Sequence, residues 1–211
     1  HGYSLSPDIM PIKVDKEYLK TPIIPFDAAE KAHIPVWITE ISDVTPLDTS
    51  IQDGLKWAVT FHNYLTKANV NAIIWWGGAM PTSNNESLII LNKNRKDYTL
   101  SKRYDILGNY SRYISEGSTR IQVTQPKNKD LLVSAYKKND KYILVAINLS
   151  EKTISTNIRL DGANIKGALK QFITNKDNRW NKTNIVPVSN KYYNLTIPQF
   201  SIVTLVGKVH L

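Results

Sequence analysis

The sequence predicts an α/β domain followed by an all-β domain, and two patterns along its 211 residues support this. In the first half, short and wholly apolar stretches are separated by amphipathic ones, as in parallel βα units whose strands are buried on both faces. From Arg120 onward, apolar and polar residues alternate in segments about ten residues apart, which is typical of an antiparallel β-sandwich. We predict domains spanning 1–115 and 116–211.

The first half contains three predicted strands and three predicted helices. The strands are expected at 1–3, 36–40 and 72–76, and the helices at 27–32, 51–67 and 101–113. The middle helix follows Ser50, a favoured N-cap residue with Asp53 three positions later, and its apolar residues have the helical period. Because strands and helices alternate, we expect one parallel sheet.

The second half contains six predicted strands joined by turn-forming residues. They are expected at 131–137, 142–148, 153–160, 168–174, 192–197 and 201–206. Asn139-Asp140 and Asp161-Gly162 supply turn residues between them. Trp180 lies in a polar loop of this half, and we expect it to anchor that loop.

Composition excludes several classes of site. The sequence has no cysteine, which rules out disulfides, zinc–thiolate sites and a thiol nucleophile. His33 and His62 lack a spacing suited to a metal, so we expect no cofactor. The net charge of +9 comes from scattered lysines, which are typical of solvated surface, and no stretch is apolar for the roughly eighteen residues of a membrane span. We expect neither nucleic acid nor a membrane as a partner.

The segment Val36-Trp37-Ile38-Thr39-Glu40 combines a buried strand with a carboxylate at its C-terminal end. In α/β barrels that end of the strands carries the chemistry, and acids of functional sites gather there. A glutamate at a strand end can equally lie in water without a role. The residues by themselves leave both interpretations open.

Several segments resemble glycoside hydrolase family 30. Residues 36–43 are similar to its nucleophile strand, residues 53–77 to its next helix and eighth barrel strand, and residues 101–114 to its last helix. Residues 132–136 and 142–148 resemble strands of its side domain. The resemblance implies the C-terminal part of a (β/α)8 TIM barrel, strands six to eight, followed by an antiparallel β-sandwich. It also implies that strands one to five come from a preceding segment or a separate chain.

The resemblance assigns the nucleophile of a retaining glycosidase to Glu40. In the family the acid/base lies in an Asn-Glu-Pro motif on the fourth strand, and this chain has no such motif. The nearest string, Asn85-Glu86-Ser87, lacks the proline, and we interpret Glu86 as a surface residue.

The resemblance also implies substrate-binding residues. His1 and Tyr3 match the end of the sixth strand, beside the nucleophile, although Tyr3 could instead pack under the following loop. Trp75 and Trp76 carry flat faces suited to sugar rings. Because side chains alternate along a strand, only one of them can face the barrel mouth, and we favour Trp76.

The implied substrate is xylan. Family members specific for glucuronoxylan carry an arginine-bearing segment after this Trp-Trp strand, where Gly77-Gly78-Ala79-Met80 stands here. We therefore expect a secreted, extracellular bacterial endo-β-1,4-xylanase with relaxed side-chain requirements. The alternatives are another β-glycan such as β-1,6-glucan, or a non-catalytic carbohydrate-binding or structural fragment.

Overall fold

The computed structural model describes residues 25–42, 44–94 and 96–210, which divide into two compact units between Tyr104 and Asp105. The boundary falls within helix α3 (Lys102–Ser111). The strand predicted at 1–3 lies outside the described residues.

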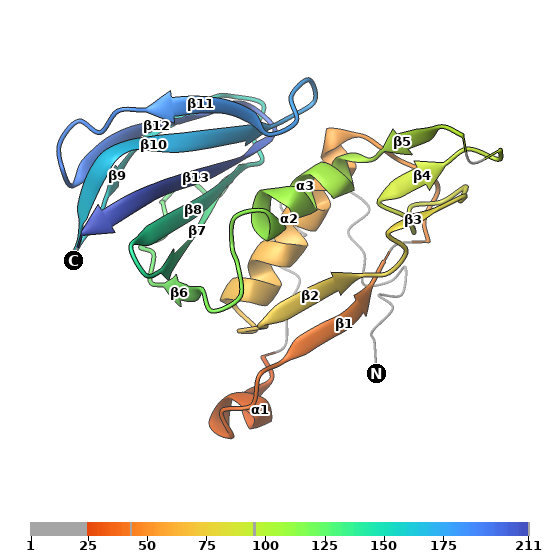
Figure 1. Cartoon of the computed structure of the whole chain (residues 1–211), viewed down its shortest axis with the longest axis horizontal. Coiled ribbons are helices and arrows are strands. Elements are labelled where there is room, and N and C mark those ends of the chain that lie inside the picture. Colours follow the sequence, from red (N-terminus) through yellow and green to blue (C-terminus); the bar gives the residue numbers. More distant parts are fainter. Residues whose placement is uncertain (1–24, 43, 95, 211) are drawn as a thin grey trace. The chain divides into compact units, whose positions relative to one another are not determined.

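The first unit contains the predicted βα elements (Figure 1). Its elements before α3 are α1 (Asp27–Lys31), β1 (Trp37–Ile41), α2 (Ile51–Thr66), β2 (Ala72–Trp75), β3 (Ala79–Met80), β4 (Ile89–Leu91) and β5 (Tyr98–Leu100). Strands β1 and β2 pair in parallel. Strands β3, β4 and β5 form a separate three-stranded sheet where a loop was expected.

Helix α2 is stabilised by an N-cap residue at its start and by the burial of its apolar face. The Ser50 hydroxyl accepts a hydrogen bond from the amide of Asp53 at 3.3 Å, which satisfies one free N–H of the first turn. Leu55 and Trp57 are buried on the helix. The Trp57 ring meets Trp75 of β2 edge-on, with 4.5 Å between ring centroids, so α2 covers one face of the parallel pair.

A buried ion pair joins the first turn of α2 to the start of α3. Arg103 is fully buried and contacts the carboxylate of Asp53, which is 1% exposed. The guanidinium also donates to the backbone oxygens of Asp48 and Ser87, at 2.6 and 3.2 Å. Burial raises the pKa of Asp53 to about 6, against the opposing effect of the Arg103 charge.

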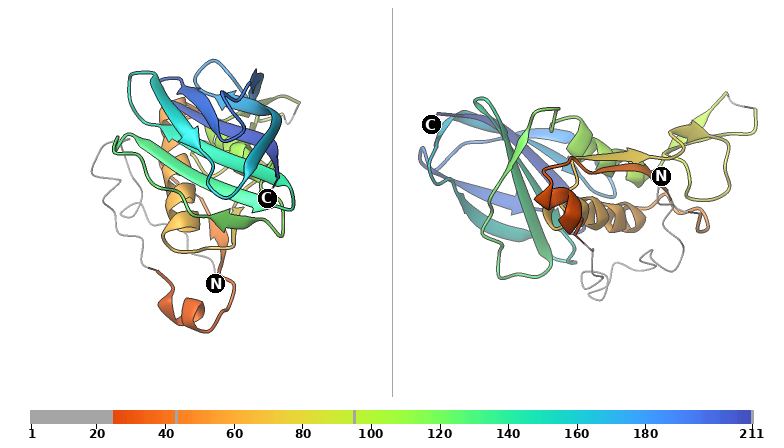
Figure 2. Two further views of the ribbon diagram at one scale, coloured as in Figure 1. Left: turned by 90° about the vertical axis from the view of Figure 1, so that its left-hand side faces the viewer. Right: turned by 90° about the horizontal axis from the view of Figure 1, so that it is seen from below.

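The second unit is an antiparallel β-sandwich whose sheets are seen from two directions in Figure 2. Its strands are β6 (Thr119–Ile121), β7 (Leu131–Lys138), β8 (Lys141–Asn148), β9 (Ile154–Arg159), β10 (Asn164–Thr174), β11 (Asn181–Ile185), β12 (Tyr192–Ile197) and β13 (Ser201–His210). One sheet has the order β11-β10-β13-β8-β7-β6, and the other pairs β12 with β9. Strands β6 and β11 were not predicted.

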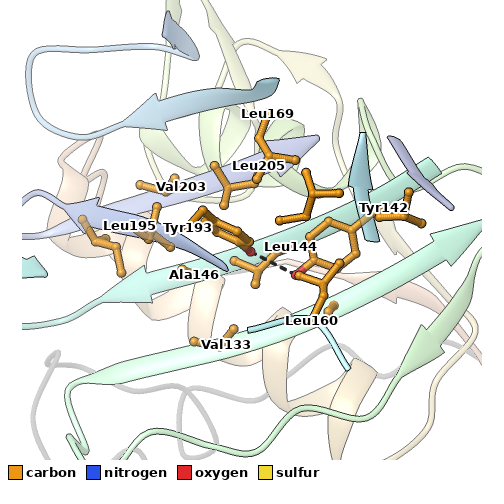
Figure 3. Packing of buried hydrophobic residues seen from close by; sticks show 14 of the residues in the cluster. Val133, Tyr142, Leu144, Ala146, Leu160, Leu169, Tyr193, Leu195, Val203 and Leu205 are labelled. Carbon is orange, nitrogen blue, oxygen red and sulfur yellow. Dashed lines mark hydrogen bonds between the residues drawn. The ribbon is translucent and has the colours of Figure 1, made fainter. Parts of the chain in front are cut away.

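The sandwich core gathers buried residues from both sheets (Figure 3). Leu144 and Leu205 come from the larger sheet and Leu195 from the smaller one. Within this apolar cluster the hydroxyls of Tyr142 and Tyr193 form a hydrogen bond of 3.1 Å. Burial raises the pKa of Tyr142 to about 12 and raises that of Tyr193 further, so both phenols stay neutral. A cavity of about 980 Å³ is lined by residues of β7, β8 and β9.

Trp180 anchors its loop to α3 within the second unit. Its indole N–H donates to the carbonyl of Asp105 at 2.8 Å, and the Arg112 guanidinium lies 4.2 Å from its ring centroid. A Cβ on Gly108 would lie 2.2 Å from the indole, so only glycine leaves room for the ring.

Candidate active site

Glu40 lies at an irregularity near the C-terminal end of β1. Ile38 pairs with Ile73 and Ile41 with Trp75, so β1 uses one residue more than β2 over this stretch. Such a bulge re-aims side chains and is frequent beside active sites. Strict alternation from the buried Ile38 would turn Glu40 toward α2, whereas the extra residue turns the fully buried Ile41 there. The pairing therefore does not require Glu40 to face α2, and its side chain is half-buried.

Trp75, the last residue of β2, and Trp76, which follows it, differ in burial. Trp75 is buried against Trp57, and its indole N–H donates to the carbonyl of Glu86 at 2.9 Å. Trp76 is 48% exposed, and its amide donates to the carbonyl of Ile41 at 2.9 Å. The backbone of Trp76 is therefore bonded to the strand end that carries Glu40.

Glu86 contacts the exposed indole of Trp76, which the sequence did not indicate. Its side chain is half-buried, and its Oε1 accepts a hydrogen bond of 3.0 Å from that indole. This contact depends on the loop folding back onto β2. The sequence does not predict this contact, because Trp76 and Glu86 do not form a recognisable motif together.

Two of the predicted site residues, His1 and Tyr3, lie outside the described residues. Trp37 is 60% exposed on β1, and Ile74 on β2 is 47% exposed. The register places both on the face of the parallel pair opposite α2, so this face is apolar and open in the described unit.

Within residues 25–42, 44–94 and 96–210, no group of three or more histidine, aspartate or glutamate side chains is arranged to hold a metal ion. Over the same residues, no helix combines the length and the apolar character needed to cross a membrane.

Comparisons with known proteins agree on the kind of protein to which this chain is similar. No family model matches it. Glucuronoxylanase XynC of Bacillus subtilis (strain 168) is 26% identical over 180 residues, which are 81% of this chain and 39% of the relative. The solved family 30 subfamily 8 xylanase Xyn30A from Clostridium acetobutylicum has a TM-score of 0.75 at 23% identity, covering 89% of this chain and 46% of that one. The chain resembles the family 30 xylanases.

This likeness confirms the resemblance to family 30 and the predicted fold class, C-terminal barrel strands followed by a β-sandwich. A conserved exported protein from Bacteroides fragilis shares the fold with a TM-score of 0.69 at 22% identity, covering 90% of this chain and 41% of that one. The chain spans about two fifths of the length of the curated relatives it matches. The domain boundary at residue 115 and the roles of the site residues stay predictions.

Proposed function

We propose that this chain contributes the nucleophile side of a retaining glycoside hydrolase that cleaves β-1,4-linked xylan internally, with Glu40 as the nucleophile. The observation that carries the proposal is the position of Glu40, at an irregularity near the end of β1. The next residue, Ile41, accepts a backbone hydrogen bond from Trp76, whose ring is exposed. A carboxylate next to a flat aromatic face suits a reaction on a sugar ring.

In this mechanism the Glu40 carboxylate attacks the anomeric carbon as the glycosidic bond breaks. A second carboxyl group about 5–5.5 Å away protonates the leaving oxygen, and a glycosyl ester on Glu40 results. Water, deprotonated by the same second group, then cleaves the ester and releases the sugar with retained configuration. We assign the second carboxyl group to the preceding part of the barrel.

The open face of the parallel pair supports a larger barrel. Exposed Trp37 and Ile74 would meet further strands there, since barrel interiors are filled by side chains. We propose that strands one to five cover this face, supplied by a preceding segment or a separate chain. Secretion fits a protein acting on a polysaccharide, and the similar Bacteroides fragilis protein is named as exported.

The test is covalent trapping with a 2-deoxy-2-fluoro xylobioside carrying a good leaving group. We expect the intact mass to rise by one fluorinated disaccharide, with the label on the peptide containing Glu40. Glu40→Gln should lower xylan hydrolysis by about a thousandfold or more, because the covalent step is lost. Glu151→Gln, the same change at an exposed residue, should leave hydrolysis unchanged.

A label on another residue, or full turnover by Glu40→Gln, would exclude Glu40 as nucleophile.

A second candidate function is favoured by the exposed rings of Trp37 and Trp76, which could bind polysaccharide without cleaving it. Retention of the purified protein on insoluble xylan with no sugar released would support that function instead. Assays of sugar release from xylan and from β-1,6-glucan, run in parallel, decide which of these two polysaccharides is the substrate.

A further inference from the structure

We propose that Glu86 and Trp76 form a saccharide-binding position beside Glu40 that takes uncharged sugars and disfavours sugars bearing a carboxylate. The inference rests on the proposed function, which supplies the polysaccharide. It gives Glu86, which takes no part in the hydrolysis described above, a role in choosing between neutral and acidic substrates.

The position of Glu86 is fixed by three hydrogen bonds. Trp76 donates to its carboxylate at 3.0 Å, Trp75 donates to its carbonyl at 2.9 Å, and its own amide donates to the Asn84 side chain at 3.0 Å. Gly77 allows this close approach, because its φ is +71° and a Cβ there would lie 2.8 Å from the Glu86 carbonyl oxygen. The carboxylate is thus held against the indole of Trp76.

The two residues flanking this carboxylate are buried and bonded to the rest of the unit. The Asn85 side chain accepts from the amide of Asp48 at 2.7 Å and donates to the Thr45 hydroxyl at 3.1 Å. The carbonyl of Ser87 accepts from the buried Arg103 at 3.2 Å. A loop anchored on both sides presents its charge at a defined place, as a binding site requires.

Trp76 connects that place to the strand end that carries the proposed nucleophile. The Trp76 amide bonds to the carbonyl of Ile41, the residue after Glu40, and its indole bonds to Glu86. A sugar bound next to Glu40 would therefore reach both the face of Trp76 and the carboxylate of Glu86.

The chemistry of the pair defines the ligand. The exposed indole offers a flat surface to a sugar ring, and carboxylate oxygens accept two hydrogen bonds each, so Glu86 can still accept from sugar hydroxyls. A uronate would place a second negative charge near the first. Like charges at a partly exposed site weaken binding by about fivefold to tenfold.

The experiment measures dissociation constants for a neutral xylo-oligosaccharide and for the same oligosaccharide carrying one glucuronic acid. Glu86→Gln keeps an oxygen that accepts from Trp76 and removes the charge. We expect it to improve the acidic-to-neutral affinity ratio about fivefold to tenfold at low salt, and less at high salt. Glu151→Gln should leave the ratio unchanged, and Trp76→Ala should weaken both ligands similarly.

An unchanged ratio in Glu86→Gln, or no binding of either sugar by the unaltered protein, would overturn the proposal. Thermal unfolding of Glu86→Gln checks that its fold is intact. Binding is measured separately from hydrolysis, so the two proposals can fail independently. A shifted ratio without trapping at Glu40 would retain the binding position and reject the nucleophile, while trapping with an unchanged ratio would do the reverse.

Discussion

The two units of this chain bury their apolar surface in different ways. In the sandwich, two sheets face one another over a cluster that includes Leu144, Leu195 and Leu205. In the first unit, α2 covers one face of the β1–β2 pair, and the other face leaves Trp37 and Ile74 exposed. The unit with the candidate chemistry is therefore the one that leaves an apolar sheet face open.

The units also differ in the polar groups that they bury. The first unit buries both members of a charged pair, Asp53 with Arg103. The second unit buries a neutral pair, Tyr142 with Tyr193, and one acid, Asp105, whose ion-pair partner Arg179 is 40% exposed. Removing one partner of a buried ion pair leaves a charge without compensation, and removing one hydroxyl of a neutral pair leaves a smaller deficit. We expect a substitution in the fully buried Asp53–Arg103 pair to cost more than one in the Tyr142–Tyr193 pair.

Arg103→Met tests this difference with the largest expected effect. The change should destabilise the first unit by about 3–5 kcal/mol, because Asp53 and two backbone oxygens lose their buried partner. Hydrogen exchange should accelerate in α2 and remain slow in β8 and β13. Arg159→Met, which removes an exposed ion pair with Asp161, is the control and should leave the stability almost unchanged. Equal effects of the two changes would contradict the comparison.

Leu195→Ala tests the sandwich core. Loss of a fully buried leucine should lower the free energy of unfolding of this unit by about 2–5 kcal/mol, measured by denaturant titration. Asn194→Ala, at the neighbouring exposed position, should stay within about 0.5 kcal/mol of the original. A cost as small for Leu195 as for Asn194 would show that the sandwich does not depend on this cluster.

The pKa of Asp53 predicts a pH dependence of the first unit. The folded chain keeps a proton on Asp53 up to about pH 6, whereas the unfolded value is 3.8. This raised pKa stabilises the folded unit below about pH 4. As the pH rises through 6 the stabilisation is lost, and the free energy of unfolding falls by roughly 3 kcal/mol at most. Urea titrations of the chain and of Asp53→Asn at pH 4 and pH 7 measure it. The asparagine variant should lack this component, and an identical pH response in both proteins would contradict the assignment.

Tyr142→Phe has the smallest expected effect. It removes one hydroxyl of the buried pair and should cost about 1 kcal/mol in a denaturant titration. Because the two hydroxyls share one bond, the double variant with Tyr193→Phe should cost less than the sum of the single changes. Strict additivity would mean that the bond contributes nothing to the sandwich.

Much of this fold follows from local sequence pattern. Apolar runs predicted β1 and β2, Ser50 predicted the start of α2, and alternation predicted most sandwich strands. Strand β11 was missed because its residues, Asn181–Ile185, are mainly polar and exposed, and only pairing with β10 makes them a strand. Strands β3 to β5 were missed because they are two or three residues long and paired through a folded loop.

The candidate site likewise contains residues that the sequence predicts and residues that it does not. Glu40 and Trp76 could be proposed because each stands where an apolar strand ends. Glu86 could not, because its bond to Trp76 depends on the path of an irregular loop. Asp53 was interpreted as a capping-box acid, and nothing in the sequence connects it to Arg103, fifty positions away. Residues at strand ends can be predicted from the local sequence, whereas contacts that depend on the path of a loop cannot.

The distribution of tryptophan gives each unit its own optical signal. Four of the five tryptophans precede Tyr104, and the remaining one, Trp180, is stacked against Arg112 in the sandwich unit. Replacing Trp180 by phenylalanine would make the emission of the chain report on the first unit alone. The exposed indoles of Trp37 and Trp76 would then contribute the red edge of that emission, and a sugar bound at Trp76 would change it.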